Sequence, residues 1–173
     1  MSMTDAPEAT EASGRITRRD DALEIALFRH LDHAAASVWS FLTDPARLPE
    51  WLAPGEIEPR VGGRARLDFV DSGTVIDSAV TAFEPGTLLE YSWSGPGEPL
   101  RPVRWSLDIE GPQACRLTLT LTTPAGDDAG RGAAGWEAHL EMLAAALEGA
   151  PIRFPFERFK AARDAYRAQL AST

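Results

Sequence analysis

Hydrophobic and polar residues alternate along the middle of the chain, as they do in strands that bury one face of a sheet. The alternation is clearest in three runs, which are Leu89/Tyr91/Trp93, Val103/Trp105/Leu107/Ile109 and Leu117/Leu119/Leu121. Further segments of this kind, GEIEP, GRARLDFV and TVIDSAVTAF, are bounded by glycine, proline or aspartate. The pattern predicts a meander of antiparallel strands with one apolar face and one solvated face.

One of these segments, TVIDSAVTAF, supports two opposite registers. Ile76 and Val80 face the core in the first register. The second register turns Val75 and Phe83 inward instead. A β-bulge within the segment would reconcile the two sets, because one extra residue reverses the alternation. The sequence alone leaves this choice open.

A long helix is expected over residues 131–148, within the stretch AAGWEAHLEMLAAALEG. At about 100° per residue its apolar residues form one narrow stripe. The stripe consists of Trp136, Leu140, Leu143 and Leu147. Glu137 and Glu141 lie about 100° away from the stripe and are predicted to be exposed to solvent. His139 lies on the opposite shoulder of the stripe, where a side chain is only partly committed to the interior.

The order of the remaining segments completes an α+β arrangement. Residues 1–20 are small, polar and acidic without periodicity, which is typical of a disordered tail. A strand begins at Leu23, and two short helices are expected to follow it. Residues 150–173 carry aromatic residues at near-helical spacing and predict an additional C-terminal helix. Residues 21–149 are therefore expected to form one domain, in which a curved antiparallel sheet wraps around the long helix.

The stretches VWSFLTDPARLPEWLAP, GGRARLDF and GWEAHLEMLAAALEG resemble the activator of heat shock protein 90 ATPase homologue-like (AHSA-type) family. That family belongs to the START, birch-pollen-allergen-like or SRPBCC superfamily, and the resemblance covers residues 23–149. It implies a helix-grip fold with a deep apolar cavity between the long helix and the sheet. Members of the superfamily hold lipids, steroids or polyketides there. A heat shock protein 90-type chaperone is implied as a partner by the family name alone.

Composition excludes several classes of partner. The chain has 17 Lys and Arg against 26 Asp and Glu, a formal net charge of −9, so neither nucleic acid nor an anionic membrane is an expected partner. No stretch reaches the roughly 20 apolar residues of a membrane span, and the N-terminus lacks the apolar core of a signal peptide. Cys115 is the only cysteine, so no internal disulfide can form. These features favour a cytoplasmic protein.

Motifs for metals and cofactors are weak. His30, His33 and His139 have neither histidine nor cysteine partners at ligand spacing, so no metal site is expected. The run GRGAAG, residues 130–135, matches a dinucleotide-binding pattern but follows a polar loop rather than a tight turn after a strand. Asp127 and Asp128 would also repel a pyrophosphate. We therefore expect no cofactor.

Aromatic residues of the predicted interior are the strongest functional signal. Tryptophan fills a core poorly unless its N–H finds a partner, and aromatic clefts are common in small-molecule sites. The candidate ligand-binding residues of the cavity are Trp51, Tyr91, Trp93, Trp105, Trp136, His139, Leu140 and Leu143. The leading hypothesis is a non-catalytic module that binds a small apolar or aromatic molecule, with no assigned catalytic residue.

Two alternatives stay open at this stage. The first is a cyclase, aromatase or hydrolase-like enzyme that uses the same cavity, in which His139 with Asp77 or Glu90 polarises a bound carbonyl. The second is an interaction protein, either chaperone-related or a homodimer formed through the C-terminal aromatic helix. Exposure of Phe156 and Phe159 would favour the second alternative.

Overall fold

A computed structural model describes residues 14–172. Its strands are β1 (Arg15–Arg19), β2 (Ala22–Leu31), β3 (Gly55–Ile57), β4 (Arg64–Phe69), β5 (Thr74–Glu84), β6 (Leu88–Ser92), β7 (Pro102–Gly111) and β8 (Ala114–Pro124). Its helices are α1 (Ala35–Thr43), the short 3-10 helix η2 (Leu48–Glu50), α2 (Ala129–Leu147) and α3 (Phe156–Ala171). The two short helices expected before the meander are therefore α1 and η2.

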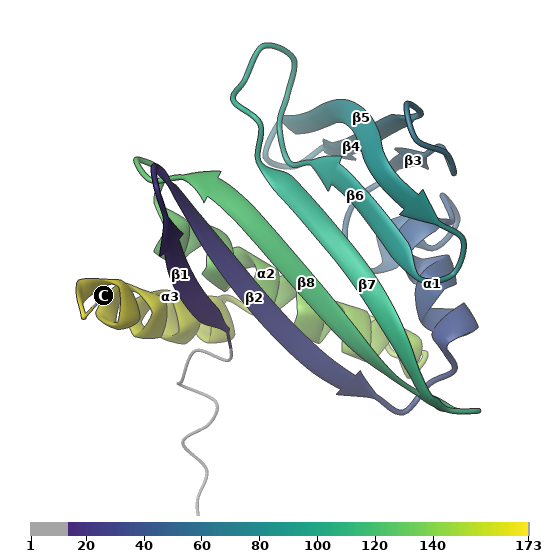
Figure 1. Cartoon of the computed structure of the whole chain (residues 1–173). Helices are drawn as coiled ribbons and strands as arrows, with labels where there is room; N and C mark the ends of the chain where they lie inside the picture. The colour runs from purple at the N-terminus through teal and green to yellow at the C-terminus, as the bar shows by residue number, and fades with distance from the viewer. Residues whose placement is uncertain (1–13, 173) are drawn as a thin grey trace, which may run out of the picture.

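The strands form one antiparallel sheet in the order β1-β2-β8-β7-β6-β5-β4-β3 within the described part of the chain. Figure 1 shows the sheet in front of α2, which lies behind β2, β8 and β7, while α3 lies at the β1 end. Between them, α2 and the sheet enclose the core. This arrangement confirms the predicted helix-grip fold.

The alternation predicted for the central strands is confirmed by burial, except that Ile109, expected on the apolar face, is 73% exposed at the end of β7, where the pairing with β8 becomes irregular. Leu89, Leu117 and Leu119 are almost inaccessible, whereas Arg104 between two buried positions is exposed. The apolar stripe of α2 faces the same interior, with Trp136 and Leu143 exposed by 6% and 1%. Each buried leucine of this kind contributes about 1.5–3 kcal/mol relative to an exposed one.

The open register of β5 is decided by a bulge. Ile76 and Val80 face the core, with exposed fractions of 3% and 1%. The pairing with β6 then shifts between Val80 and Ala82, and Phe83 also packs against the core. The bulge thus turns members of both competing sets inward, because the extra residue inverts the alternation beyond it.

The predicted N-terminal tail is too long. Arg15–Arg19 form β1, in which Ile16 pairs with Ile25 and is only 6% exposed, so the expectation of disorder through residue 20 is wrong for this segment. The backbone N–H of Ile16 also donates to the side-chain oxygen of Gln169 in α3, at 2.8 Å. A hairpin partner and a helix far away in sequence hold this polar strand. Residues 1–13, on which the rest of that prediction falls, lie outside the described residues.

The predicted exposure of Glu137 is wrong as well. Its carboxylate is 0% exposed, because α3 packs against the flank of α2 that carries it. There it accepts hydrogen bonds from Arg29 of β2, from Arg158 and from the hydroxyl of Tyr166. Glu141, one helical turn further on, is exposed as predicted. An amphipathic pattern identifies the face toward the sheet but not a second partner on the flank.

Candidate functional site

Most of the predicted ligand-binding residues pack as solid core beneath α2. Trp51, Tyr91, Trp105, Leu140 and Leu143 are each no more than 2% exposed. The Trp51 and Trp105 rings meet edge to face with centroids 5.7 Å apart, and the Trp51 indole N–H donates to the carbonyl of Phe41 at 2.7 Å. Buried tryptophan thus finds the hydrogen-bond partner that it needs. These residues leave little free space under the middle of the helix.

A cavity of about 170 Å³ lies instead at the N-terminal end of α2. Of the eight predicted residues, Trp93 and Trp136 line it. Their ring centroids are 4.7 Å apart at an interplanar angle of 67°. Apolar side chains of three neighbouring strands form the opposite wall, and these are Ile25, Val103 and Leu121.

Small residues in the first turns of α2 create this cavity. Ala129, Gly132 and Ala133 line it at the i, i+3, i+4 spacing that places them on one helix face. A Cβ added at Gly132 would meet no atom within 4 Å, so the space beside it is open. Gly132 is exposed and Trp93 is only partly buried, and the cavity therefore opens to solvent here. The small residues of the run GRGAAG therefore leave free space in the interior, and we do not interpret the run as a phosphate-binding loop.

An ion pair lies at the mouth of the cavity. Arg101, just before β7, donates from Nε to Oδ2 of Asp127, just before α2, at 2.6 Å. The hydroxyl of Thr123 donates to the same oxygen at 2.7 Å. These two hydrogen bonds, the one from Arg101 first, lower the pKa of the Asp127 carboxyl, which therefore stays ionised at neutral pH. The pair ties the loop between β6 and β7 to the loop between β8 and α2.

Asp128, beside this pair, has a structural role. Its carboxylate accepts the backbone N–H of Arg131 at 3.1 Å and caps α2. It also pairs with Arg167 of α3 at 3.0 Å. The backbone hydrogen bond is the main cause of its lowered pKa. Because both of its oxygens are engaged, Asp128 orients the helix start rather than facing a ligand.

His139 belongs to an aromatic cluster beside the cavity without lining the cavity itself. The cluster consists of Phe69, Trp93, Trp136, His139 and Phe154, with neighbouring centroids 4.7–6.0 Å apart. The Nδ1 of His139 lies 3.1 Å from the carbonyl oxygen of Trp51, and since a carbonyl only accepts, Nδ1 carries the proton. Burial lowers the pKa of this imidazole, so His139 is neutral at pH 7.

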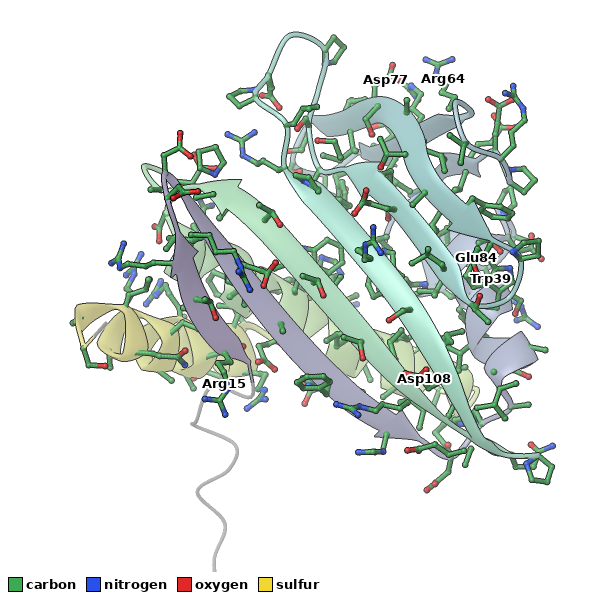
Figure 2. The ribbon with its side chains drawn as sticks, in the orientation of Figure 1. Arg15, Trp39, Arg64, Asp77, Glu84 and Asp108 are labelled. Atoms are coloured by element: carbon green, nitrogen blue, oxygen red, sulfur yellow. The ribbon has the colours of Figure 1, made fainter. Side chains whose placement is uncertain are left out.

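The acid–base pairs considered for an enzyme are not assembled. Asp77 and Glu90 alternate with buried residues of β5 and β6 and so point to the sheet face away from α2. Asp77 pairs with Arg64 at 2.9 Å, and Figure 2 shows these two residues beside each other. Glu90 pairs with Arg104 at 3.0 Å on the same face. The sheet thus separates both carboxylates from His139.

Each of the other two histidines lies beside a glutamate. His30 lies 3.1 Å from Glu110, and His33 lies 2.7 Å from Glu148. Over residues 14–172, no group of three or more histidine, cysteine, aspartate or glutamate side chains is arranged to hold a metal ion.

Cys115 is fully buried, and this burial raises the pKa of its thiol. No helix of the described chain is long and apolar enough to span a membrane.

Sequence reasoning missed the polar mouth and the helix wall of the cavity. In the sequence, Asp127 indicates only repulsion of a pyrophosphate, and no pattern around Arg101 points to a site. The available signal was the spacing of Ala129, Gly132 and Ala133, which puts three small residues on one side of the helix at its first turns. Small residues on a helix also serve as ordinary filler, so the spacing becomes informative only once the opposing strands are known.

Comparisons with known proteins agree with this architecture. Among solved structures, CalU16 from Micromonospora echinospora shares 24% identity and a TM-score of 0.75, covering 91% of this chain and 96% of that chain. BPP1335 from Bordetella parapertussis shares 28% identity and a TM-score of 0.68, covering 95% of each chain. DynU16, a protein of the dynemicin biosynthetic locus, shares 31% identity and a TM-score of 0.66, covering 77% of this chain and 49% of that chain.

No curated protein matches the chain in sequence. The sequence model of the family described as Activator of Hsp90 ATPase homolog 1-like protein matches residues 32–148, which is more than half of the chain. The match extends from the start of α1 to the end of α2, so that it includes the helix wall of the cavity but not α3. The chain therefore belongs to the family of Activator of Hsp90 ATPase homolog 1-like proteins.

Proposed function

We propose that this protein binds a compact aromatic or apolar molecule in the cavity between Trp93 and Trp136. The observation that carries the proposal is an open, largely apolar hollow of about 170 Å³ with two tryptophan rings in its wall. An apolar cavity of about 150 Å³ accepts a molecule of the size of benzene. The hollow is therefore suited to one aromatic ring, with any larger part of the ligand extending toward solvent.

The chemistry of the walls supports binding rather than turnover. The charged residues that line the cavity are Arg101, Asp127 and Asp128, and each is engaged in an ion pair. His139 donates its Nδ1 proton to a backbone carbonyl and lies outside the cavity wall. No described cysteine or serine lines the cavity as a nucleophile. DynU16, a structural relative, comes from a biosynthetic locus, which is consistent with a role beside small-molecule chemistry.

Titration with toluene and benzene tests the proposal. Binding at one site per chain should quench tryptophan fluorescence saturably, because Trp93 and Trp136 border the site. A ligand present at about 100 times its dissociation constant should add roughly 2.7 kcal/mol to the free energy of unfolding. Failure of both compounds to change fluorescence or the unfolding midpoint would refute the proposal.

Gly132 supplies a matched pair of variants for this test. Gly132→Leu places a branched side chain in the open space and should abolish binding, while Gly132→Ala adds a single methyl group and should retain most of it. Both variants should fold, because Gly132 is exposed and lies in a helix. Equal binding by the two variants would place the ligand elsewhere.

A second candidate function is self-association through the C-terminal helix α3, at its exposed first residue Phe156. Phe156 is 64% exposed and Ile152 is 42% exposed, whereas Phe159 is partly buried against the core. Phe156 also contacts the ring of Phe154, with centroids 4.9 Å apart, and exposed apolar side chains favour a protein contact. A concentration-dependent mass in analytical ultracentrifugation, lost in Phe156→Ser, would support a homodimer. A monomer at all concentrations would exclude it.

A further inference from the structure

The cavity mouth also specifies the polar group of its ligand, an inference that rests on the proposed function. We propose that the ligand is a neutral aromatic molecule carrying a group that both donates and accepts a hydrogen bond, such as a phenolic hydroxyl or a carboxamide. The Arg101–Asp127 ion pair forms the hydrogen bonds to this group.

The pair offers one acceptor and several donors beside the apolar floor. Among the described residues, the hydrogen bonds of the Asp127 carboxylate all reach Oδ2, from Arg101 Nε and Thr123 Oγ1. Oδ1 accepts none from them. Only Nε of the Arg101 guanidinium donates to a described residue, while Nη1 lies 3.8 Å from the nearest oxygen of Glu98. One free carboxylate oxygen and free guanidinium N–H groups therefore lie at the mouth of the same cavity.

The two charges of the pair cancel for a ligand that approaches both. A carboxylate on the ligand is attracted to Arg101 and repelled by Asp127, and an ammonium group experiences the reverse. Either charged group must also lose water on entering a mouth where the pair's side chains are about 28% and 29% exposed. Neither gains enough net attraction to offset that loss.

A neutral donor–acceptor group avoids this conflict. A phenolic O–H donates to Oδ1 of Asp127 while its oxygen accepts from Arg101, and a carboxamide divides the two roles between its N–H and its carbonyl. Both contacts are hydrogen bonds to charged groups, which are the stronger kind. The aromatic ring attached to such a group then lies against Trp93 and Trp136.

The test compares ring compounds of similar size. Toluene, phenol, benzamide, benzoate and benzylamine are titrated at pH 7 with tryptophan fluorescence as the readout. Phenol and benzamide should bind on the order of tenfold more tightly than toluene, and benzoate and benzylamine should bind no better than toluene. If no compound binds, including toluene, the proposed function itself fails. If toluene binds and phenol and benzamide give no advantage, only the present inference fails.

Substitution of either member of the Arg101–Asp127 pair should make the cavity prefer ligands of one charge over the other. Asp127→Asn leaves Arg101 without its counter-charge, so benzoate should gain on the order of tenfold over benzylamine. Arg101→Met leaves Asp127 unpaired, and benzylamine should gain over benzoate by a similar factor. Arg101→Lys retains the charge and should keep the original order. An unchanged order in Asp127→Asn and Arg101→Met, with unfolding midpoints showing that both are folded, would overturn the inference.

Discussion

The hydroxyl of Tyr166 in α3 donates to the carboxylate of Glu137 in α2 at 2.5 Å, and neither side chain is exposed. Arg29 of β2 reaches the other oxygen of the same carboxylate at 2.5 Å. The backbone N–H of Gly14 donates in turn to the Tyr166 hydroxyl at 2.8 Å. The start of the described chain, the sheet, the long helix and the last helix are therefore joined through one buried acid.

Removal of that acid should destabilise the protein severely. Glu137→Ala leaves the charges of Arg29 and Arg158 without their buried partner, which should cost about 3–5 kcal/mol in the free energy of unfolding. Tyr166→Phe removes one hydrogen bond to a charged group and should cost about 1.5–3 kcal/mol. Urea denaturation measures both losses. Glu141 is exposed, so Glu141→Ala is the matched control and should change the free energy of unfolding by less than about 0.5 kcal/mol. If Glu137→Ala lost as little as this control, the hydrogen bonds of Glu137 would not stabilise the fold.

Two glycines of α2 should respond differently to substitution by alanine. Gly132→Ala introduces a methyl group into open space within a helix and should raise the free energy of unfolding by about 0.5–1 kcal/mol. A Cβ at Gly130 would lie 2.9 Å from Cγ of Arg167, so Gly130→Ala must displace this side chain and should be neutral or destabilising. Thermal unfolding of the two variants side by side distinguishes the cases. Equal stabilisation in both would show that α3 does not pack tightly against Gly130.

The Arg101–Asp127 ion pair at the mouth of the cavity should make the free energy of unfolding depend on pH in the acid range. The folded-state pKa of Asp127 is lowered by Arg101, so the pair stabilises the fold above the unfolded-state pKa of about 3.9 and loses this effect as pH falls through the folded-state value. The free energy of unfolding should therefore fall less between pH 6 and pH 3 in Asp127→Asn than in the unaltered protein. Parallel curves would show that Asp127 has the same pKa in both states.

His139 should act in a different pH range. Its folded-state pKa lies below the unfolded value of about 6.5, because burial disfavours the imidazolium. As pH falls, His139 is therefore protonated at a higher pH in the unfolded chain than in the folded protein. The protein should lose stability as pH falls from 8 to 5.5. His139→Gln, whose side-chain amide can donate to the carbonyl of Trp51, should show a weaker dependence over that range. Titration by NMR of the imidazole nitrogens gives the pKa directly, and a value above 6.5 would refute the argument.

The periodic spacing of apolar residues predicted much of the fold, because this spacing depends only on the local geometry of strands and helices. The inward residues of the central strands and the stripe of Trp136, Leu140 and Leu143 follow from repeats of 2 and 3.6 residues, which the backbone imposes wherever one face is buried. The same rule could not place Glu137, because burial of a helix flank depends on a second helix that packs there. It also missed β1, since an edge strand with the sequence RITRR carries only one buried side chain.

The amino-acid sequence by itself determined the strand meander, the long helix, the family and the aromatic character of the interior. Only the tertiary structure decided where that interior is solid and where it is hollow. Trp51 and Trp105 pack against each other although they are distant in sequence, while Trp93 and Trp136 line a cavity together with the small residues Gly132 and Ala133. A periodic pattern assigns each side chain to a face. The volume left between two faces depends on which side chains meet across them, and this is set by the packing of α2 on the sheet.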